Sequence, residues 1–348
     1  MKKLSYLTLL GILLCLQTIS FAQEDKSYFT LDPTLSPDAK TIVFSYDGDL
    51  WKVPTSGGEA SRLTAMDGEE TRPAISPDGK WLVFSSTQMG NRDLYLMPLA
   101  GGAIKQLTYH QANDDVDAWS WDSQTIYFTS NRFNRFAGYS ISPKGGTPKR
   151  LFGHYFNTVH NLAPHPTSGE IFFNESWESK YFAHRKRYKG AFNPDIKSYN
   201  PQTGVYKTYT DYIGKDFGAT IAKDGTVYFM SDEANGEYNL YTFDKGKKKR
   251  LTKFKHSILW PKVSANGEKV VFRKAYQIFV YDVKSGKTTQ PYIRLYKNQT
   301  HDKTETYNVS GHISNFNVSS DNKKIAFVSR GRLFVSDIKG KFIKELNT

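Results

Sequence analysis

Cysteine is nearly absent from this chain of 348 residues: the single one, Cys15, lies inside the apolar N-terminal segment. Residues 23–348 therefore contain no thiol that could form a disulfide or bind zinc. A chain of this length can bury a sizeable core without such cross-links. We therefore expect core burial to stabilise the fold.

Recognisable catalytic and nucleotide-binding motifs are also missing. The sequence has no Gly-x-Ser-x-Gly nucleophile elbow, no His-Glu-x-x-His helix, no Walker loop and no dinucleotide fingerprint. The closest candidate for a pair of metal ligands is His160 with His165, for which structural roles are the commoner explanation. We therefore predict no catalytic residue, no metal site and no cofactor in this chain. The residues leave open whether the chain is part of an enzyme.

What the sequence has instead is a repeated phrase, a turn of the type Ser-Pro-Asp-Gly-Lys followed by a short apolar strand such as Trp-Leu-Val-Phe-Ser. Pro, Asp and Gly supply turn geometry, and alternating β-branched and aromatic residues are typical of a half-buried strand. A second strand and a Gly-rich hairpin follow in most copies, which end on Leu-Thr or a variant of it. The copies begin at Ser36, Ser76, Ser120, Pro164, Ala222, Ser264 and Ser319.

The repeat predicts an all-β fold, a β-propeller of four-stranded blades. Four strands per unit and a period of roughly forty residues are typical of propeller blades. A solenoid would have shorter and more uniform units, and a β-sandwich would not repeat its sequence. One acidic string, residues 113–117, lacks the Gly-spaced alternation of a calcium loop, so we interpret it as a solvated connection between blades.

The seven copies of the phrase are not evenly spaced. Six units fill residues 23–293, whereas residues 294–311 are polar and contain no strand-turn phrase. A connection of that kind is unusual within a propeller and natural between two of them. We therefore predict a six-bladed propeller at 23–293, a linker at 294–311 and the first blade of a second propeller at 312–348. Because a single blade cannot bury both of its faces, we expect this last unit to be the least stably packed.

Residues 1–22 have the pattern of a secretory signal peptide. Two lysines precede the apolar run from Leu4 to Phe21, and the small residue Ala22 precedes the expected cleavage site. We therefore predict an exported, periplasmic protein with no membrane association after cleavage. The alternative is a retained membrane anchor, but the run is shorter than a comfortable transmembrane span of about 20 apolar residues. The formal net charge is +13, but the lysine-rich stretch at 245–250 fits a solvated hairpin turn. Export also argues against a nucleic-acid partner.

The fourth unit departs from the pattern by inserting a basic and aromatic stretch after residue 173. Insertions in propellers lie in loops, where function is usually added. An arginine fork in such a loop can bind an acidic or C-terminal carboxylate group. The alternative is that the stretch packs against a neighbouring blade or domain. The candidate substrate-binding residues are Trp177, Arg185, Arg187, Tyr188 and Lys189.

The Ser-Pro-Asp-Gly repeats resemble TolB-like propellers broadly. Three segments are more specific: Asp-Gly-Asp-Leu-Trp-Lys-Val at 47–53, His-Arg-Lys-Arg-Tyr-Lys-Gly at 184–190 and Ile-Ala-Phe-Val-Ser-Arg-Gly-Arg-Leu-Phe at 325–334. Together they resemble the amino-terminal part of a tricorn-type serine protease, and the likeness extends over residues 23–348. The resemblance implies a six-bladed propeller followed by a seven-bladed one, a PDZ domain and a serine-peptidase core. It also implies that the catalytic residues lie beyond Thr348, so none is assigned here.

Three functions follow as hypotheses. The first, implied by the resemblance, is a non-catalytic propeller of an exported tricorn-like peptidase. It would gate or guide peptides or unfolded polypeptides. It would also act as a scaffold for the PDZ and peptidase domains of the same polypeptide, in a possible homo-oligomer. The second is a free-standing periplasmic TolB-like adaptor that docks partner proteins on one rim. The third is a hydrolase or lyase that uses carboxylates around the central channel. We expect Leu, Pro, Ala and Val at most innermost-strand positions, which counts against the third.

Overall fold

The computed structural model describes residues 28–152, 158–296 and 308–346, and the signal peptide predicted at 1–22 lies outside these ranges. The chain divides into two compact units, the first extending to Tyr296 and the second beginning at Lys297. This division falls within residues 294–311, where the sequence predicts a linker.

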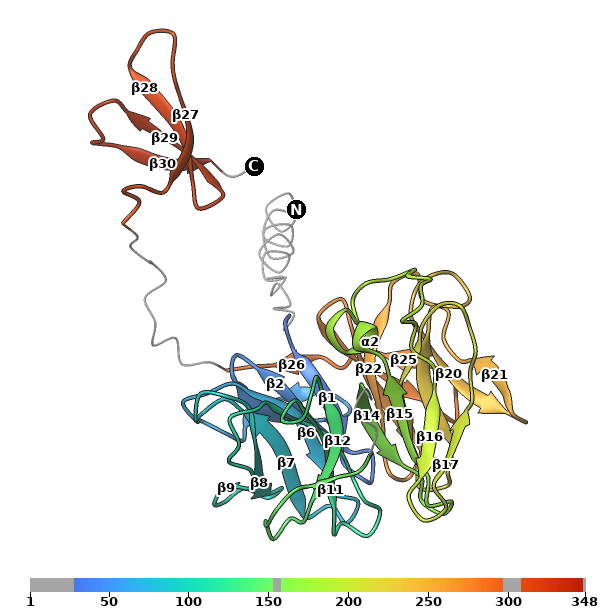
Figure 1. Ribbon diagram of the computed structural model, residues 1–348. Coiled ribbons are helices and arrows are strands. Elements are labelled where there is room, and N and C mark those ends of the chain that lie inside the picture. The colour runs from blue at the N-terminus through green and yellow to red at the C-terminus, as the bar shows by residue number, and fades with distance from the viewer. Residues whose placement is uncertain (1–27, 153–157, 297–307, 347–348) are drawn as a thin grey trace, which may run out of the picture. The chain divides into compact units, whose positions relative to one another are not determined.

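The first unit contains six four-stranded antiparallel sheets, one for each of the first six copies of the repeat. Figure 1 shows them arranged as the blades of a propeller, so the predicted all-β propeller fold is confirmed. Blade one comprises β1 (Leu31–Leu35), β2 (Thr41–Tyr46), β3 (Asp49–Pro54) and β5 (Ser61–Arg62). Blade two comprises β6 (Glu70–Ile75), β7 (Trp81–Ser86), β8 (Asp93–Pro98) and β9 (Lys105–Gln106). Blade three comprises β10 (Asp114–Trp119), β11 (Ile126–Ser130), β12 (Ala137–Ile141) and β13 (Lys149–Arg150). Blade four comprises β14 (Val159–Pro164), β15 (Ile171–Glu175), β16 (Lys197–Asn200) and β17 (Val205–Thr208). Blade five comprises β18 (Asp216–Ile221), β19 (Val227–Ser231), β20 (Asn239–Asp244) and β21 (Lys247–Arg250). Blade six comprises β22 (Ile258–Val263), β23 (Lys269–Lys274), β24 (Gln277–Asp282) and β25 (Thr288–Thr289).

The turn phrase forms the same hydrogen-bonded structure in successive blades. In blade one, Ser36 Oγ donates to Asp38 Oδ1 at 2.6 Å and accepts the backbone N–H of Thr41 at 2.9 Å. The backbone N–H of Lys40 donates to the same Asp38 oxygen at 3.2 Å. The two side chains thus satisfy backbone donors that the tight turn would otherwise leave unpaired. This is why the phrase reliably reverses the chain between the first and second strands.

Six hydrophobic clusters lie between neighbouring blades, one at each of the six junctions of a closed ring. The cluster between blades one and two, for example, joins Val43 and Leu50 to Phe84 and Tyr95. The cluster between blades six and one joins Val271 to Phe44 and so connects the two ends of the unit. Both faces of every blade are therefore buried, which is the packing that a propeller requires.

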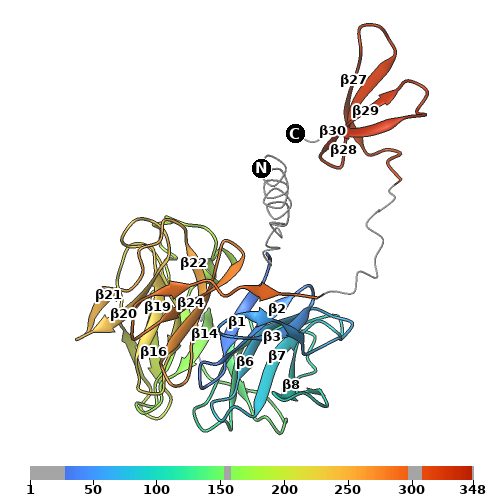
Figure 2. The ribbon, with the colours of Figure 1, turned by 180° about the vertical axis from the view of Figure 1, so that it is seen from behind.

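The ring closes through a short parallel pairing and not by exchange of a blade strand. The segment after blade six forms β26 (Ile293–Arg294), which pairs with β4 (Gly58–Glu59) in the hairpin of blade one (Figure 2). The N–H of Gly58 donates to the carbonyl of Tyr292 at 2.7 Å, and that of Ala60 donates to the carbonyl of Arg294 at 2.9 Å. Each blade therefore consists of one continuous stretch of chain.

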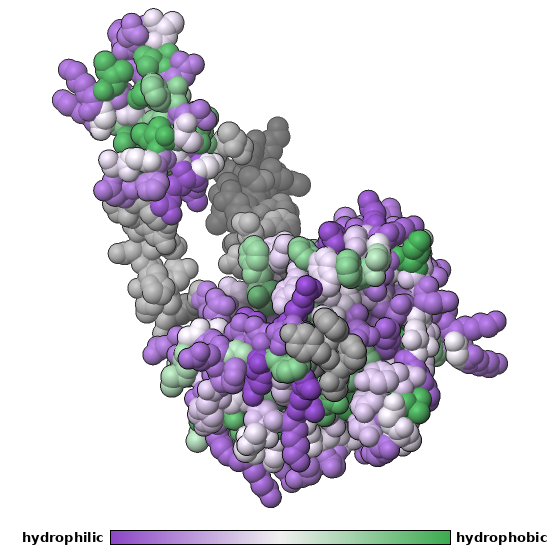
Figure 3. All heavy atoms as spheres, viewed as in Figure 1, coloured by the Kyte–Doolittle hydropathy of each residue, from purple (hydrophilic) through white to green (hydrophobic). Residues whose placement is uncertain are grey.

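The second unit is one four-stranded antiparallel sheet of β27 (Ile313–Val318), β28 (Lys324–Ser329), β29 (Arg332–Asp337) and β30 (Ile343–Leu346). It repeats the blade pattern, including a hydrogen bond from Ser319 Oγ to Asp321 Oδ1 at 2.5 Å. Large apolar side chains remain exposed, with Phe316 at 70% and Phe342 at 61%. Figure 3 shows hydrophobic residues, coloured green, on the surface of this unit. The sheet has the composition of a blade without the neighbours that cover one.

Candidate functional site

The innermost strand of every blade in the ring contains a β-bulge at the same place. In five blades the bulge holds one residue in the left-handed region, with φ between 45° and 72°. These residues are Asp32, Arg72, Asn161, Gly218 and Trp260. A bulge inserts an unpaired residue and re-aims its side chain. Proline follows the bulge residue in three of the blades. Proline has no N–H, but no hydrogen bond between the strands is lost at a bulge.

The bulges bring polar side chains from different blades to the centre of the ring. Asp32, Arg72, Asn161 and Trp260, together with Asp117 of blade three, line one small cavity of about 40 Å³. These positions are far apart in sequence and belong to blades one, two, four, six and three. The bulges thus build a polar axial layer in a fold whose blade interfaces are apolar.

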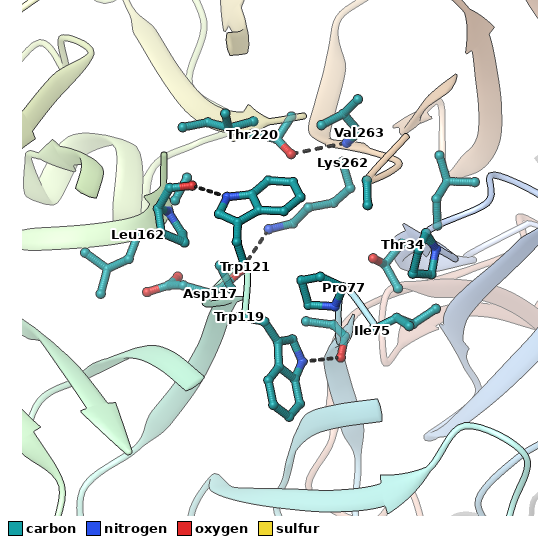
Figure 4. Close-up of a pocket in the computed structure, with 18 of the residues that line it drawn as sticks. Thr34, Ile75, Pro77, Asp117, Trp119, Trp121, Leu162, Thr220, Lys262 and Val263 are labelled. Atoms are coloured by element: carbon teal, nitrogen blue, oxygen red, sulfur yellow. Dashed lines mark hydrogen bonds between the residues drawn. The ribbon is translucent and has the colours of Figure 1, made fainter. Parts of the chain in front are cut away.

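A wider chamber continues along the same strands, with a volume of about 110 Å³ (Figure 4). All six innermost strands contribute to its wall, so it is the central channel of the propeller. Two indoles are fixed there, because Trp119 Nε1 donates to the carbonyl of Ala74 at 2.9 Å and Trp121 Nε1 donates to that of Pro164 at 2.8 Å. Lys262 Nζ donates to the carbonyl of Asp117 at 3.1 Å. The chamber therefore combines rigid aromatic walls with one ammonium group.

Asp115 is the centre of the ionic contacts at the end of the channel where the innermost strands begin. Its Oδ1 lies 2.7 Å from Arg92 Nε and 3.6 Å from Arg72 Nε, and its Oδ2 lies 2.5 Å from Lys180 Nζ. Burial opposes ionisation of Asp115, but these three cations outweigh it and hold the pKa of the carboxyl group well below its usual range. Asp115 is therefore a carboxylate under all physiological conditions.

Asp117, two residues further along the same strand, has the opposite environment. Burial raises its pKa, although nearby Lys180 and a 2.6 Å hydrogen bond from Thr129 Oγ1 partly offset this. Burial likewise lowers the pKa of Lys262. The expected Leu, Pro, Ala and Val do line most of the wider chamber, whereas the narrower axial layer is polar, because each bulge shifts the alternation of the strand by one residue. Acidic side chains do line the channel, from blades one and three.

The insertion in blade four places a short helix, α2 (Trp177–Tyr181), over this end of the channel. Ser179 Oγ lies 2.8 Å from His160 Nε2, and the Tyr181 ring packs edge-on against Phe136. Lys180 points into the axial layer to reach Asp115. The helix is thereby tied to blades three and four, and its lysine completes the charged cluster.

A buried ion pair holds α2 on its other side. Lys215 Nζ, at the start of blade five, lies 2.6 Å from Glu178 Oε1, and both side chains are fully buried. Arg185 pairs with the same carboxylate and also donates from Nε to Glu178 Oε1 at 2.8 Å. The helix consequently rests on contacts to three successive blades.

The five predicted substrate-binding residues all lie in this insertion, but most of their side chains contact other residues of the chain. Trp177 packs on Phe182 and Phe192, and the Arg185 guanidinium lies 4.1 Å from the centre of the Tyr188 ring in addition to its pairing with Glu178. Arg187 Nη2 lies 3.2 Å from a Glu237 oxygen, whereas Lys189 is exposed. Binding of a polypeptide by these residues stays a prediction.

Two other sequence interpretations meet a different structure. The acidic string at 113–117 is not a solvated connection, because Asp114–Trp119 forms the innermost strand of blade three with Asp114 and Asp115 buried. His160 is buried on β14, and burial, followed by the charges of Lys180 and Arg72, holds its pKa well below its usual value. In the described parts of the chain, no group of three or more His, Cys, Asp or Glu side chains is arranged to hold a metal ion.

Sequence reasoning missed the axial charged layer as a whole. The residues that form it, such as Arg72, Asp117 and Lys262, come from separate repeats and share no motif. One feature does recur: a polar or aromatic residue stands directly before proline in three of the innermost strands, at Asp32, Arg72 and Trp260. That position could have identified the bulges, because proline inside a strand is typical of them.

Comparisons with known proteins agree with this architecture. Residues 29–287 match the family model of the tricorn protease N-terminal beta propeller domain. Tricorn protease homolog 1 of Streptomyces coelicolor is 35% identical over 54 residues, which are 16% of this chain and 5% of that protein.

Two solved structures share the fold at low sequence identity. The crystal structure of the tricorn protease superposes with a TM-score of 0.65 at 18% identity, covering 92% of this chain and 31% of that one. TolB from Acinetobacter baumannii gives a TM-score of 0.56, also at 18% identity, covering 76% of this chain and 63% of TolB. The chain thus spans about a third of the tricorn protease chain that it matches. Within the residues that the structure describes, no helix is both long and apolar enough to cross a bilayer. The family match covers most of the ring, and the chain belongs to the tricorn protease N-terminal beta propeller domain family.

Proposed function

We propose that this chain is the propeller module of an exported tricorn-like peptidase and that its central channel guides peptides or unfolded polypeptides. The observation that carries the proposal is the axial layer, in which charged side chains from several blades converge on a narrow channel. A channel lined with both signs of charge and with fixed indoles can contact backbone and side chains of many sequences without selecting one. Such tolerance suits a passage and not a specific binding site.

The channel is narrow at the axial layer. A cavity of about 40 Å³ holds little more than one water molecule. We propose that a polypeptide passes only when α2 moves and the Lys180–Asp115 contact breaks. We infer that this pair acts as the gate of the channel, with the insertion as its moving part.

Photo-crosslinking from inside the channel tests this proposal. A photoreactive phenylalanine at Trp260, an aromatic replacement for an aromatic, should capture casein-derived peptides, and adding Lys180→Ala should increase the yield. The control is the same group at Tyr206, which is 52% exposed on the outer strand β17 of blade four. Equal capture at both positions would show that peptides bind the surface without entering the channel.

The second unit supports a scaffolding role. Its sheet exposes apolar side chains such as Phe316, Ile338 and Phe342, which a neighbouring blade would cover. We propose that it begins a second propeller, with PDZ and peptidase domains of the same polypeptide as partners and a homo-oligomer as the assembled form. Gel filtration of a polypeptide carrying these domains should give a particle several times its monomer mass. A strictly monomeric particle would contradict the oligomer.

Export to the periplasm is proposed from the pattern of residues 1–22 alone. Expression with this segment should yield a shortened product that begins near Gln23 in the periplasmic fraction. A full-length product that stays with the cytoplasmic fraction would contradict the proposal.

A TolB-like adaptor remains the second candidate, because TolB shares the fold. An adaptor would bind a folded partner on one rim. Crosslinks from rim positions such as Lys189 to a folded envelope protein, without any from Trp260, would favour it.

A further inference from the structure

A third cavity lies on the face of the ring that carries the insertion, and it has a volume of about 290 Å³. Its wall combines the loop after α2 with segments of blades five and six. Imidazole, ammonium, guanidinium and phenol groups make up much of that wall, and no Asp or Glu is among the lining residues. The polar lining residues are His184, Lys186, Tyr238, His256, Ser257, Arg273, Lys274 and Tyr276.

Arg273 is the distinctive residue of this cavity. It lies on β23 beside Leu259 and is only 8% exposed. Among the described residues its guanidinium has neither a hydrogen bond nor a carboxylate within 4 Å, and its Cζ lies 6.0 Å from the centre of the Tyr276 ring. Burial lowers the pKa of Arg273, and the negative charge of Asp32 only partly offsets this. The side chain is largely buried, but Arg273 lines the cavity, so its guanidinium is available to an anion that the protein does not supply.

Of the neighbouring groups, Lys274 adds to the positive potential of the cavity. Burial, and then the charge of Arg273, lowers the pKa of the His184 imidazole. The Lys274 ammonium lies 4.3 Å from the centre of the Phe279 ring and has no carboxylate partner among the described residues. Lys186 is neutralised by Glu237, whose oxygens lie 2.8 and 2.9 Å from its Nζ. Arg273 and Lys274 are therefore the two cations of the cavity wall that no described carboxylate pairs with directly.

We propose that this cavity binds a phosphate group, either free phosphate or the phosphate of a small monoester, with Arg273 as its principal ligand. Two unbalanced cations match a dianion better than a carboxylate, and the arginine fork can donate two parallel hydrogen bonds to phosphate oxygens. The imidazoles of His184 and His256 can each add a donor at the mouth. The cavity is larger than a phosphate ion, so an organic group could rest on the Tyr276 ring. The same anion would bind whether or not polypeptides use the central channel.

Isothermal titration of the full chain with inorganic phosphate and with phenyl phosphate tests the site, with acetate as the monoanion for comparison. We expect saturable phosphate binding with a Kd below about 1 mM and much weaker acetate binding. Stronger binding of phenyl phosphate would identify a monoester as the occupant, and equal binding would identify free phosphate. Acetate binding as tight as that of phosphate would overturn the proposal, as would no saturable binding up to about 10 mM.

Substitutions locate the binding. Arg273→Gln should weaken phosphate binding at least about tenfold, because a charged donor pair is lost. The control is Lys247→Gln, which removes one exposed positive charge from the outer strand of blade five. Unchanged affinity in Arg273→Gln, or an equal loss in Lys247→Gln, would overturn the assignment.

An independent variant covers the possibility that Arg273→Gln unfolds. His184→Gln changes an exposed side chain at the mouth and should leave the fold intact. In the unaltered protein, phosphate should raise the pKa of the His184 ring in a proton NMR titration, because an anion opposes the effect of Arg273. A His184 signal unmoved by saturating phosphate would place the bound anion elsewhere.

Discussion

Lys180 Nζ lies 2.5 Å from Asp115 Oδ2, although the two residues are 65 positions apart and belong to different blades. The lysine comes from the inserted helix and the aspartate from the innermost strand of blade three. This contact joins the insertion, the part of the chain that departs most from the repeat, to the axis of the ring. Replacing the lysine and replacing the aspartate should therefore lower the stability of the ring by different amounts.

Asp115→Asn should destabilise the ring more than Lys180→Met. Without its carboxylate, the buried cluster keeps Arg72, Arg92 and Lys180 as unbalanced cations, and we expect a loss of about 3 kcal/mol in the free energy of unfolding. Without Lys180, Asp115 retains two arginines, and the loss should be nearer 1 kcal/mol. Urea denaturation at neutral pH compares the two. A larger loss in Lys180→Met would mean that the arginines do not stabilise Asp115.

Asp93→Asn should stabilise the protein at neutral pH. Burial raises the pKa of Asp93 to about 6, so the folded state binds a proton more readily than the unfolded state does. The stability gained from this is fully present below the unfolded pKa of about 4 and is lost as the pH rises through 6. Asparagine has no such loss, and we expect a gain of about 2 kcal/mol at pH 7.

Blade five already contains the equivalent arrangement. There Thr252 Oγ1 donates to Asn239 Oδ1 at 3.0 Å, as Thr108 Oγ1 donates to Asp93 Oδ1 at 3.1 Å in blade two. The measurement is the free energy of unfolding between pH 4 and 7 for both proteins. If the difference between them does not grow with pH over this range, Asp93 is ionised in the folded state.

Gly57→Ala should weaken ring closure. Gly57 has φ of +90°, and a Cβ there would lie 2.5 Å from the carbonyl oxygen of Tyr292 in the closing segment. The control is Gly101→Ala, the corresponding hairpin position in blade two, with φ of +102° and open space around the added carbon. Both substitutions place an alanine at a positive φ, so the backbone strain is similar in the two variants. The clash with Tyr292 alone should make the loss in the free energy of unfolding about 2 kcal/mol larger for Gly57→Ala. Thermal unfolding decides; equal losses would show that the closing segment yields freely.

The second unit should exchange its amide hydrogens fastest of all the described sheets. Its β28 and β29 are fully hydrogen-bonded, but Phe316 and Ile343 are more than half exposed, so little buried apolar surface opposes opening. Hydrogen-exchange mass spectrometry of the full chain compares peptides of this sheet with those of blades one to six. Protection equal to that of blade three would indicate that a further surface covers the sheet.

The blades could be predicted from the sequence because each is local. Ser36 and Asp38 act on backbone groups within five residues, so the turn is encoded where it forms. The channel could not be predicted in the same way. Asp115, Arg72 and Lys180 meet only after the ring has closed, and the bulges that aim Asp32 and Trp260 inward reverse the alternation that the strands suggest. The sequence shows that the insertion is unusual, but its contacts with Lys215 and Glu237 depend on the neighbouring blade five.

Closure by β26 and β4 also determines how the ring responds to force. A pull on the chain beyond Tyr296 reaches the propeller first at a pairing of two residues, Ile293 with Gly58 and Arg294 with Glu59. Because no blade shares a strand with another in the described part of the chain, what lies behind this pairing is the hydrophobic cluster between blades six and one. Once the pairing breaks, blade six can detach first and the other blades can then detach one after another. An unfoldase that grips the chain on that side would therefore meet its main resistance in the six inter-blade hydrophobic clusters, taken in turn.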